Sequence, residues 1–269
     1  MKYGIDLHLH THYSDGIKSP ADVVEFMADL DFYAIAICDH DTTLGIEKAV
    51  EAASNYSLNI ISGIEFTTSR CDMLGLFVDP KNPILKLYER DMKNSHERIN
   101  REIVDSLKGR YDITIDDIMA VGHGTRSDPQ IAHVLYKKGY FKSFGESFKT
   151  IFPNRLAANR RRAIIDPKQA IQITHEAGGL AVLPHKYHSQ LSMSEVKDMV
   201  KYGLDGVEVY HHTASRFGQW RLRRFAKKNG LKITIGSDYH GMYYPKFDSE
   251  SIVEDIIWVY FEMETRRKK

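Results

Sequence analysis

Cysteine is nearly absent from this sequence, which has two cysteines among 269 residues. Both of them, Cys38 and Cys71, lie in apolar stretches that are typical of strands. A chain of this length with so few cysteines does not indicate a disulfide framework. We therefore expect a protein of the reducing cytoplasm.

Long apolar runs are also missing, because no stretch approaches the roughly 18 apolar residues of a membrane-spanning helix. The N-terminal segment turns polar at Asp6 and lacks the apolar run of a signal peptide. Neither charge is in excess, since 37 Lys and Arg residues balance 36 Asp and Glu residues. These absences predict a soluble protein with no membrane partner and no strong binding to duplex nucleic acid, so an anionic substrate must be held locally.

Short apolar runs recur along the chain, each followed by polar residues and then by a helical pattern. This alternation is typical of parallel β/α units and predicts a TIM-like barrel that forms one domain over residues 1–269. Seven strands are expected, at residues 2–7, 33–38, 58–64, 73–78, 179–183, 206–210 and 231–235.

About a hundred residues separate the fourth and fifth of these strands, which is too long for a crossover connection. Helical patterns fill residues 83–108 and 130–138 of this segment. We predict an inserted helical subdomain at about residues 80–165, which could cover the mouth of the barrel. A separately folding domain is the alternative, but the barrel pattern continues on both sides of the segment.

The strongest functional signal is the sequence Asp-Leu-His-Leu-His at residues 6–10. Alternate residues of a strand point the same way, so His8 and His10 would direct two imidazoles at one point. The loop after this strand could return the carboxylate of Asp15 to the same place. A strand with polar ends is the alternative, and it is weakened by the recurrence of similar residues later in the chain.

Potential metal ligands recur at the ends of four further predicted strands. In a β/α barrel the C-terminal ends of the strands converge on one face, where catalytic groups gather. These later ligands are His40, Glu65, His185, Asp238 and His240. Together with His8, His10 and Asp15 they are too many for one tetrahedral zinc ion, so the set predicts a cluster of two or three zinc, manganese or iron ions. Glu65 is the natural bridge, because a carboxylate has two oxygens that can each bind a different ion.

The motifs at residues 6–16, 39–43, 63–65, 185 and 236–241 resemble those of the polymerase and histidinol phosphatase (PHP) superfamily, and most closely its stand-alone metal-dependent phosphoesterases. The resemblance implies a distorted seven-stranded β/α barrel with a trinuclear metal site. It assigns His8, His10, Glu65 and Asp238 to the first metal, Glu65 and His185 to the second, and Asp15, His40 and His240 to the third.

Two positions depart from the pattern of this superfamily. A histidine usually precedes the Leu-Gly pair after the third strand, and this chain has Asp72 in that region, which makes Asp72 the candidate ligand. A carboxylate there would favour a harder ion such as manganese. In the insertion, Gln130 stands where the superfamily often has a histidine. Arg126 or Arg162 could then bind the substrate phosphate, since guanidinium groups grip phosphate oxygens in pairs.

The sequence therefore predicts a hydrolase that uses a metal-activated hydroxide on a phosphate ester of a small metabolite, a nucleotide or an oligonucleotide end. Glu65, His185 and His240 are the residues expected to act in catalysis. Two alternatives stay open: an amidohydrolase-type enzyme that cleaves a C–N bond, and a metal-binding barrel without catalytic activity. The oligomeric state is not indicated by any sequence feature.

Overall fold

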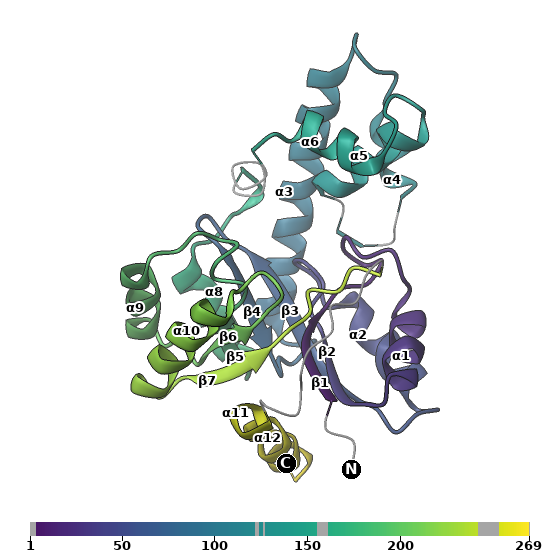
Figure 1. The fold of residues 1–269 in the computed structure, drawn as a ribbon. Coiled ribbons are helices and arrows are strands. Elements are labelled where there is room, and N and C mark those ends of the chain that lie inside the picture. The colour runs from purple at the N-terminus through teal and green to yellow at the C-terminus, as the bar shows by residue number, and fades with distance from the viewer. Residues whose placement is uncertain (1–3, 122–123, 126, 155–160, 242–252, 269) are drawn as a thin grey trace.

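The protein is described here by a computed structural model, which covers residues 4–121, 124–125, 127–154, 161–241 and 253–268. Seven strands form one sheet and lie in it in the order of the chain (Figure 1). They are β1 (Gly4–Leu9), β2 (Phe32–Ile37), β3 (Asn59–Thr67), β4 (Asp72–Leu76), β5 (Leu180–Leu183), β6 (Gly206–Tyr210) and β7 (Lys232–Ile235). All seven lie within a few residues of the predicted strands.

One strand runs against the prediction of uniformly parallel β/α units. β4 pairs antiparallel with both β3 and β5, whereas the other four neighbouring pairs are parallel. The cause is the short connection of four residues between Thr67 and Asp72, because a parallel crossover needs a dozen or more residues. As a result Asp72, at the start of β4, lies at the same edge of the sheet as the C-terminal ends of its neighbours.

The sheet is curled, and its first strand approaches the segment that comes after its last strand. The backbone N–H of Asp238 donates to the carbonyl of His8 at 3.0 Å, and the N–H of His10 donates to the carbonyl of Tyr239 at 2.9 Å. The architecture is therefore an α/β fold built on a curled seven-stranded sheet. These two bonds also fix the loop after β7 directly beside the histidines of β1.

Helices connect and cover the strands (Figure 1). Several begin with a side-chain cap and a proline; the Ser19 hydroxyl, for example, accepts a bond from the N–H of Asp22, and Pro20 occupies the first turn. The helices are α1 (Pro20–Asp29), α2 (Leu44–Ala53), α3 (Pro83–Leu107), α4 (Ile115–Met119), α5 (Asp128–Lys137), α6 (Phe144–Ile151), α8 (Pro167–Glu176), α9 (Met193–Lys201), α10 (Arg216–Lys228), α11 (Val253–Ile256) and α12 (Trp258–Arg267). No helix in the described ranges is both long enough and apolar enough to cross a membrane.

The alternation of side chains in β1 separates the core from the site. Ile5 and Leu7 pack with residues of α11 and α12, and Leu9 packs with residues of α1 and α2. Asp6, His8 and His10 therefore point to the opposite, inner face of the curled sheet, where they are almost completely buried.

Of the helices between β4 and β5, α8 packs against the sheet, as does the first half of α3, whereas α4, α5 and α6 lie away from it. α3 rises from it, and α4, α5 and α6 gather around the far half of α3 (Figure 1). This group has an apolar cluster of its own, in which Ile99 and Ile103 of α3 pack with Ile131 and Leu135 of α5. The insertion predicted at about residues 80–165 includes these helices. That they form a subdomain remains a prediction.

Candidate metal centre

The predicted ligands converge in three overlapping groups at one edge of the sheet. Within each group the ligand atoms lie within 4.8 Å of one another. The first group is His8, His10, Glu65 and Asp238; the second is Glu65, Asp72 and His185; the third is His10, Asp15, His40 and His240. The structure thus brings all nine residues predicted as ligands together, and it places His10 in two of the groups.

Glu65 lies at the centre of the arrangement. Its Oε2 atom lies 3.2 Å from His8 Nε2 and 3.3 Å from the Nε2 atoms of His10 and His40. Its Oε1 atom lies 2.9 Å from His185 Nε2. Glu65 is almost completely buried, so both oxygens of its carboxylate are surrounded by imidazoles rather than by water.

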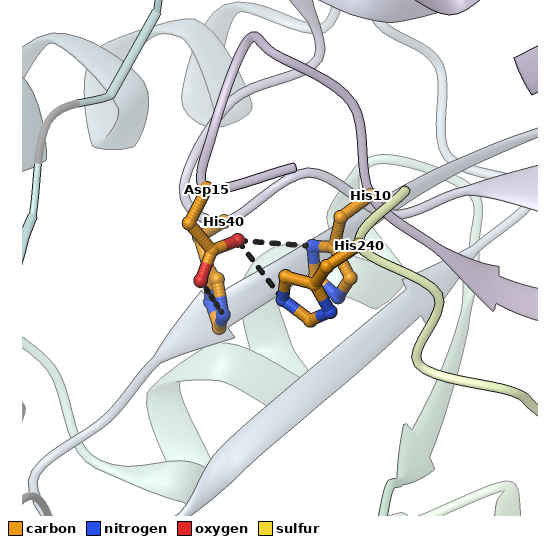
Figure 2. Close-up of side chains that lie close together, drawn as sticks. All are labelled: His10, Asp15, His40 and His240. Carbon is orange, nitrogen blue, oxygen red and sulfur yellow. Dashed lines mark ion pairs between the residues drawn. The ribbon is translucent and has the colours of Figure 1, made fainter. Parts of the chain in front are cut away.

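The third group is assembled from three separate segments (Figure 2). The Oδ1 atom of Asp15 lies 3.2 Å from His240 Nε2 and 3.7 Å from His10 Nδ1, and its Oδ2 atom lies 3.9 Å from His40 Nε2. The loop of Asp15 is held by Asp39, which accepts hydrogen bonds at 2.7 Å from Ser14 Oγ and from the backbone N–H of Thr11.

Two of the potential ligands have unusual backbone conformations. His185, directly after β5, has a φ of 25°, and Asp238, after β7, has a φ of 56°. Residues with side chains rarely adopt positive φ, and such strain is found preferentially at functional sites. Here it turns the chain sharply at the strand end, so that both side chains face the centre.

The electrostatic environment couples the imidazoles to the carboxylates. Burial opposes the protonation of His10, but the carboxylates of Asp238 and Glu65, which lie 3.1 Å and 3.3 Å from its Nε2 atom, raise its pKa to about 9. Burial also opposes the protonation of His40 and His185. The charge of Glu65 raises the pKa of His40 to about 9, and the hydrogen bond with Glu65 raises that of His185 to about 9. In the metal-free protein, protons on the imidazoles thus supply the positive charge that metal ions would otherwise supply.

Asp72 behaves differently from the other carboxylates of the centre. Its burial, and then the nearby charge of Glu65, raise the pKa of Asp72 to about 6. Two buried carboxylates at this spacing need a positive charge between them to be stable when both are ionised. A cation in the second group would meet that need.

Glu208 of β6 belongs to the centre and was missed by the sequence analysis. Its Oε1 atom accepts a hydrogen bond from His8 Nδ1 at 3.1 Å, and its Oε2 atom accepts one from the backbone N–H of His185 at 2.8 Å. A carboxylate in this position fixes the imidazole so that Nε2 is free to bind a metal. The available signal was one charged residue in the middle of an otherwise apolar strand.

A pocket of about 190 Å³ opens over the groups. Three further histidines, which are not among the predicted ligands, line it: His188, His211 and His212. The Nδ1 atom of His211 contacts Thr213, 2.7 Å from its hydroxyl oxygen and 3.2 Å from its backbone nitrogen. The Nε2 atom on the other side of the ring is buried without a hydrogen-bond partner, and Asp238 Oδ2 lies 3.8 Å away.

The donor set fits divalent metal ions. In the described part of the chain, His8 Nε2, His10 Nε2 and Glu65 Oε2 are buried and have no hydrogen-bond partner. Leaving such atoms unpaired is costly, and at this spacing a cation would satisfy several of them at once. Mixed imidazole and carboxylate ligands are those of zinc, manganese and iron.

Of the two arginines predicted to bind substrate, the structure describes Arg162 and not Arg126. Arg162 is only 1% exposed; it forms an ion pair with Asp128 and donates from Nη1 to Asn100 Oδ1 at 2.8 Å. Its donors are thus directed to protein partners, and it is not among the residues that line the pocket. Arg126 lies outside the described residues.

Gln130, at the position where a histidine was expected, donates to the carbonyl of Ser14 at 2.6 Å and so supports the loop of Asp15.

A curled α/β sheet whose strand ends gather imidazoles and carboxylates in one buried pocket defines the protein as a metal-dependent hydrolase. Comparison with known proteins narrows this class. The family model described as PHP domain matches residues 6–151, so the chain belongs to the PHP family. In agreement with the sequence analysis, it is a hydrolase that acts on phosphate esters.

Three known proteins illustrate the relationship. A 5'-3' exoribonuclease of Haemophilus influenzae is 28% identical, over 87% of this chain and 89% of its own. A phosphoribosyl 1,2-cyclic phosphate 1,2-diphosphodiesterase of Eggerthella lenta is 27% identical, over 88% and 94%. The crystal structure of a candidate metal-dependent phosphoesterase from Bifidobacterium adolescentis is 27% identical and superimposes with a TM-score of 0.79, over 94% of this chain and 96% of that one.

Proposed function

We propose that the protein hydrolyses the phosphate ester of a nucleotide or of an oligonucleotide end, and that it does so with three divalent ions of manganese, zinc or iron. The observation that supports this most directly is the position of Glu65, whose two oxygens lie within 3.3 Å of four imidazole nitrogens. Relatives named as an exoribonuclease and as a cyclic phosphate diesterase support the substrate class.

Each group of ligands would hold one ion. His8, His10, Glu65 and Asp238 would bind the first, Glu65, Asp72 and His185 the second, and Asp15, His40 and His240 the third. When bound, the ions would supply a deprotonated water for attack on phosphorus and positive charge for the phosphoryl oxygens. The protein then needs no nucleophilic side chain of its own.

Residues around the ligands would orient the ester. With its proton on Nε2, His211 would donate to a phosphoryl oxygen, because this atom lies at the pocket and has no hydrogen-bond partner in the described part of the protein. Glu208 would hold His8 in one orientation. We retain the contacts of Arg126 and Arg162 with substrate as predictions, although the proposed function does not depend on them.

The proposal extends to the architecture. The hydrogen bonds between the loop after β7 and β1 support a sheet closed into a distorted barrel. The group of helices from α3 to α6 supports one domain, residues 1–269, with a helical insertion at about 80–165. The insertion would then lie above the edge of the sheet at which the ligands converge.

The test is hydrolysis by the purified protein, loaded in turn with manganese, zinc and iron, of a panel of mononucleotides, cyclic phosphates and short oligonucleotides. We expect release of phosphate or of mononucleotides, and a Glu65→Gln variant should lose nearly all of it together with bound metal. Glu264→Gln is the matched control, because Glu264 is exposed and pairs only with Arg267 among the described residues. Absence of cleavage with every metal, or wild-type turnover by Glu65→Gln, would contradict the proposal.

The same samples distinguish the two alternatives. Cleavage of cyclic amides with no cleavage of phosphate esters would favour the amidohydrolase. A metal content near zero, with no activity regained when metal is added, would favour a barrel without catalytic activity.

A further inference from the structure

The outer face of α10 has two large aromatic side chains in solvent. Phe217 is 65% exposed and Trp220 is 51% exposed. With Arg221 and Arg224 they occupy positions separated by three, four and seven residues, which form one face of a helix. We call these four residues the α10 stripe. The opposite face of the helix is buried through Gly218, Leu222 and Ala226 and anchors it to the protein.

The aromatic rings of the α10 stripe are ordered against one another and against its arginines. Phe217 and Trp220 are stacked, with ring centroids 5.7 Å apart and planes inclined by 20°. The guanidinium of Arg224 lies 4.9 Å from the Trp220 ring, and that of Arg221 lies 5.8 Å from the Phe217 ring. The α10 stripe therefore exposes flat aromatic rings to solvent next to the positive charges of its arginines.

The charge of α10 is exceptional in a chain whose net charge is +1. Its 13 residues contain six basic residues and no acidic residue. Arg223 and Lys227 pair with Asp255. Arg221 and Arg224 make no ion pair within the described ranges, so the α10 stripe is a local positive surface.

The α10 stripe lies close to the pocket. Thr213 lines the pocket, and α10 begins three residues later, at Arg216. An extended chain covers at most about 3.6 Å per residue and a helix about 1.5 Å per residue, so Trp220 is at most about 17 Å from Thr213 along the chain. At about 3.4 Å per stacked base, this distance corresponds to about five nucleotides.

We propose that the α10 stripe binds the single-stranded part of an oligonucleotide whose end lies in the pocket. Stacked aromatic rings bind bases of any sequence, and arginines beside them bind the phosphates, which is how proteins hold single strands. The inference rests on the proposed function and extends it from the reacting phosphate to the bases behind it. An anionic membrane is less well matched, because a membrane-binding helix exposes a broad apolar face and α10 exposes two apolar rings.

The chain provides its own reporter of this interaction. It has two tryptophans, Trp220 and Trp258, and Trp258 donates from Nε1 to the carbonyl of Ile233. In a Trp258→Phe variant of the metal-loaded protein, all tryptophan fluorescence, excited selectively over that of the tyrosines, arises from Trp220. The probe is a 2'-O-methyl oligoadenylate of ten nucleotides. We expect saturable quenching, and a salt dependence that becomes weaker by about 1.4 in the slope of log K against log salt when Arg221 and Arg224 are both replaced by Ala.

A second readout does not depend on Trp220. Binding of a 3'-fluorescein form of the same oligoadenylate, followed by anisotropy, should weaken at least about fivefold in Phe217→Ala and in Trp220→Ala. Phe261→Ala is the matched control, because Phe261 is 67% exposed on α12. It should bind the probe as the wild type does.

Several results would overturn the inference. They are no binding of the oligoadenylate, equal binding by the α10 variants and the wild type, and quenching by vesicles of phosphatidylserine and phosphatidylcholine but not by the oligoadenylate. Failure of the proposed function is a separate result, since it would appear as absence of hydrolysis by the wild type whether or not the probe binds.

Discussion

At the scale of single residues, the metal centre depends on side chains that contact the potential metal-binding residues and do not contact the substrate. Glu208 is the clearest example, because one carboxylate bonds both the His8 ring and the backbone N–H of His185. We expect Glu208→Gln to lower metal affinity by about 10- to 100-fold, since the replacement loses the charge that makes His8 a strong ligand. Metal titration monitored by calorimetry measures this directly. Unchanged affinity, equal to that of the surface variant Glu264→Gln, would refute the role of Glu208.

Gly236 shows how tightly the same residues are packed. A Cβ atom at this position would lie 2.0 Å from Glu208 Oε1 and 2.4 Å from His8 Cβ. Because His8 Cβ is attached to the backbone of β1, it cannot swing away. We expect Gly236→Ala to destabilise the fold by about 1–3 kcal/mol or more, measured by urea unfolding.

Gly145 is the control for Gly236. It lies within α6, and a Cβ atom there would meet nothing within 4 Å. Gly145→Ala should leave stability unchanged or raise it by up to about 1 kcal/mol, because alanine has the higher helix propensity. Equal effects of the two substitutions would show that packing at Gly236 is not the cause.

At the scale of elements, the antiparallel β4 brings Asp72 into the centre. Asp72 is the first residue of β4, and it joins Glu65 and His185 within 4.8 Å. We expect Asp72→His to keep or raise activity and to increase the affinity for zinc relative to manganese, because imidazole suits zinc better than a carboxylate does. Asp72→Ala should instead lower the number of bound ions. Metal analysis with turnover measurements checks both, and a folded but inactive Asp72→His protein would mean that the short connection before β4 leaves no room for an imidazole.

The elements also show what could be read from the sequence. Apolar runs located every strand of the described sheet, and residues at the strand ends located the groups that could bind metal, because both depend on local patterns. The direction of β4 depends on a connection of four residues that looks like any other turn. Alternation with Val207 and Val209 indicates the face of β6 on which Glu208 lies, but only the curl of the sheet brings that face to His8. The pairing of Arg162 with Asp128 depends on contact between residues 34 positions apart. Such features follow from tertiary geometry, which spacing along the chain does not reveal.

At the scale of the whole molecule, the centre gathers many titratable groups that are buried or partly buried. In the absence of metal, His10, His40 and His185 each have a pKa of about 9, because the surrounding carboxylates outweigh the effect of burial. In the unfolded chain the same imidazoles have pKa values near 6.5. The stability of the metal-free protein is therefore linked to pH through these histidines.

The sign of this dependence is opposite to the usual effect of buried carboxylates. An imidazole whose pKa is raised by folding stabilises the fold fully below about pH 6.5, and this contribution is lost as the pH rises to about 9. We expect the unfolding temperature of the metal-free protein to fall by about 5–10 °C between pH 6.5 and pH 9, on the basis of a few kcal/mol. Manganese should abolish this fall, because a bound ion takes the place of the protons and binds more tightly as the imidazoles lose them. Circular dichroism of metal-stripped and manganese-loaded samples across this range makes the comparison, and a metal-free protein equally stable at both pH values would show that its imidazoles are not held in the charged form.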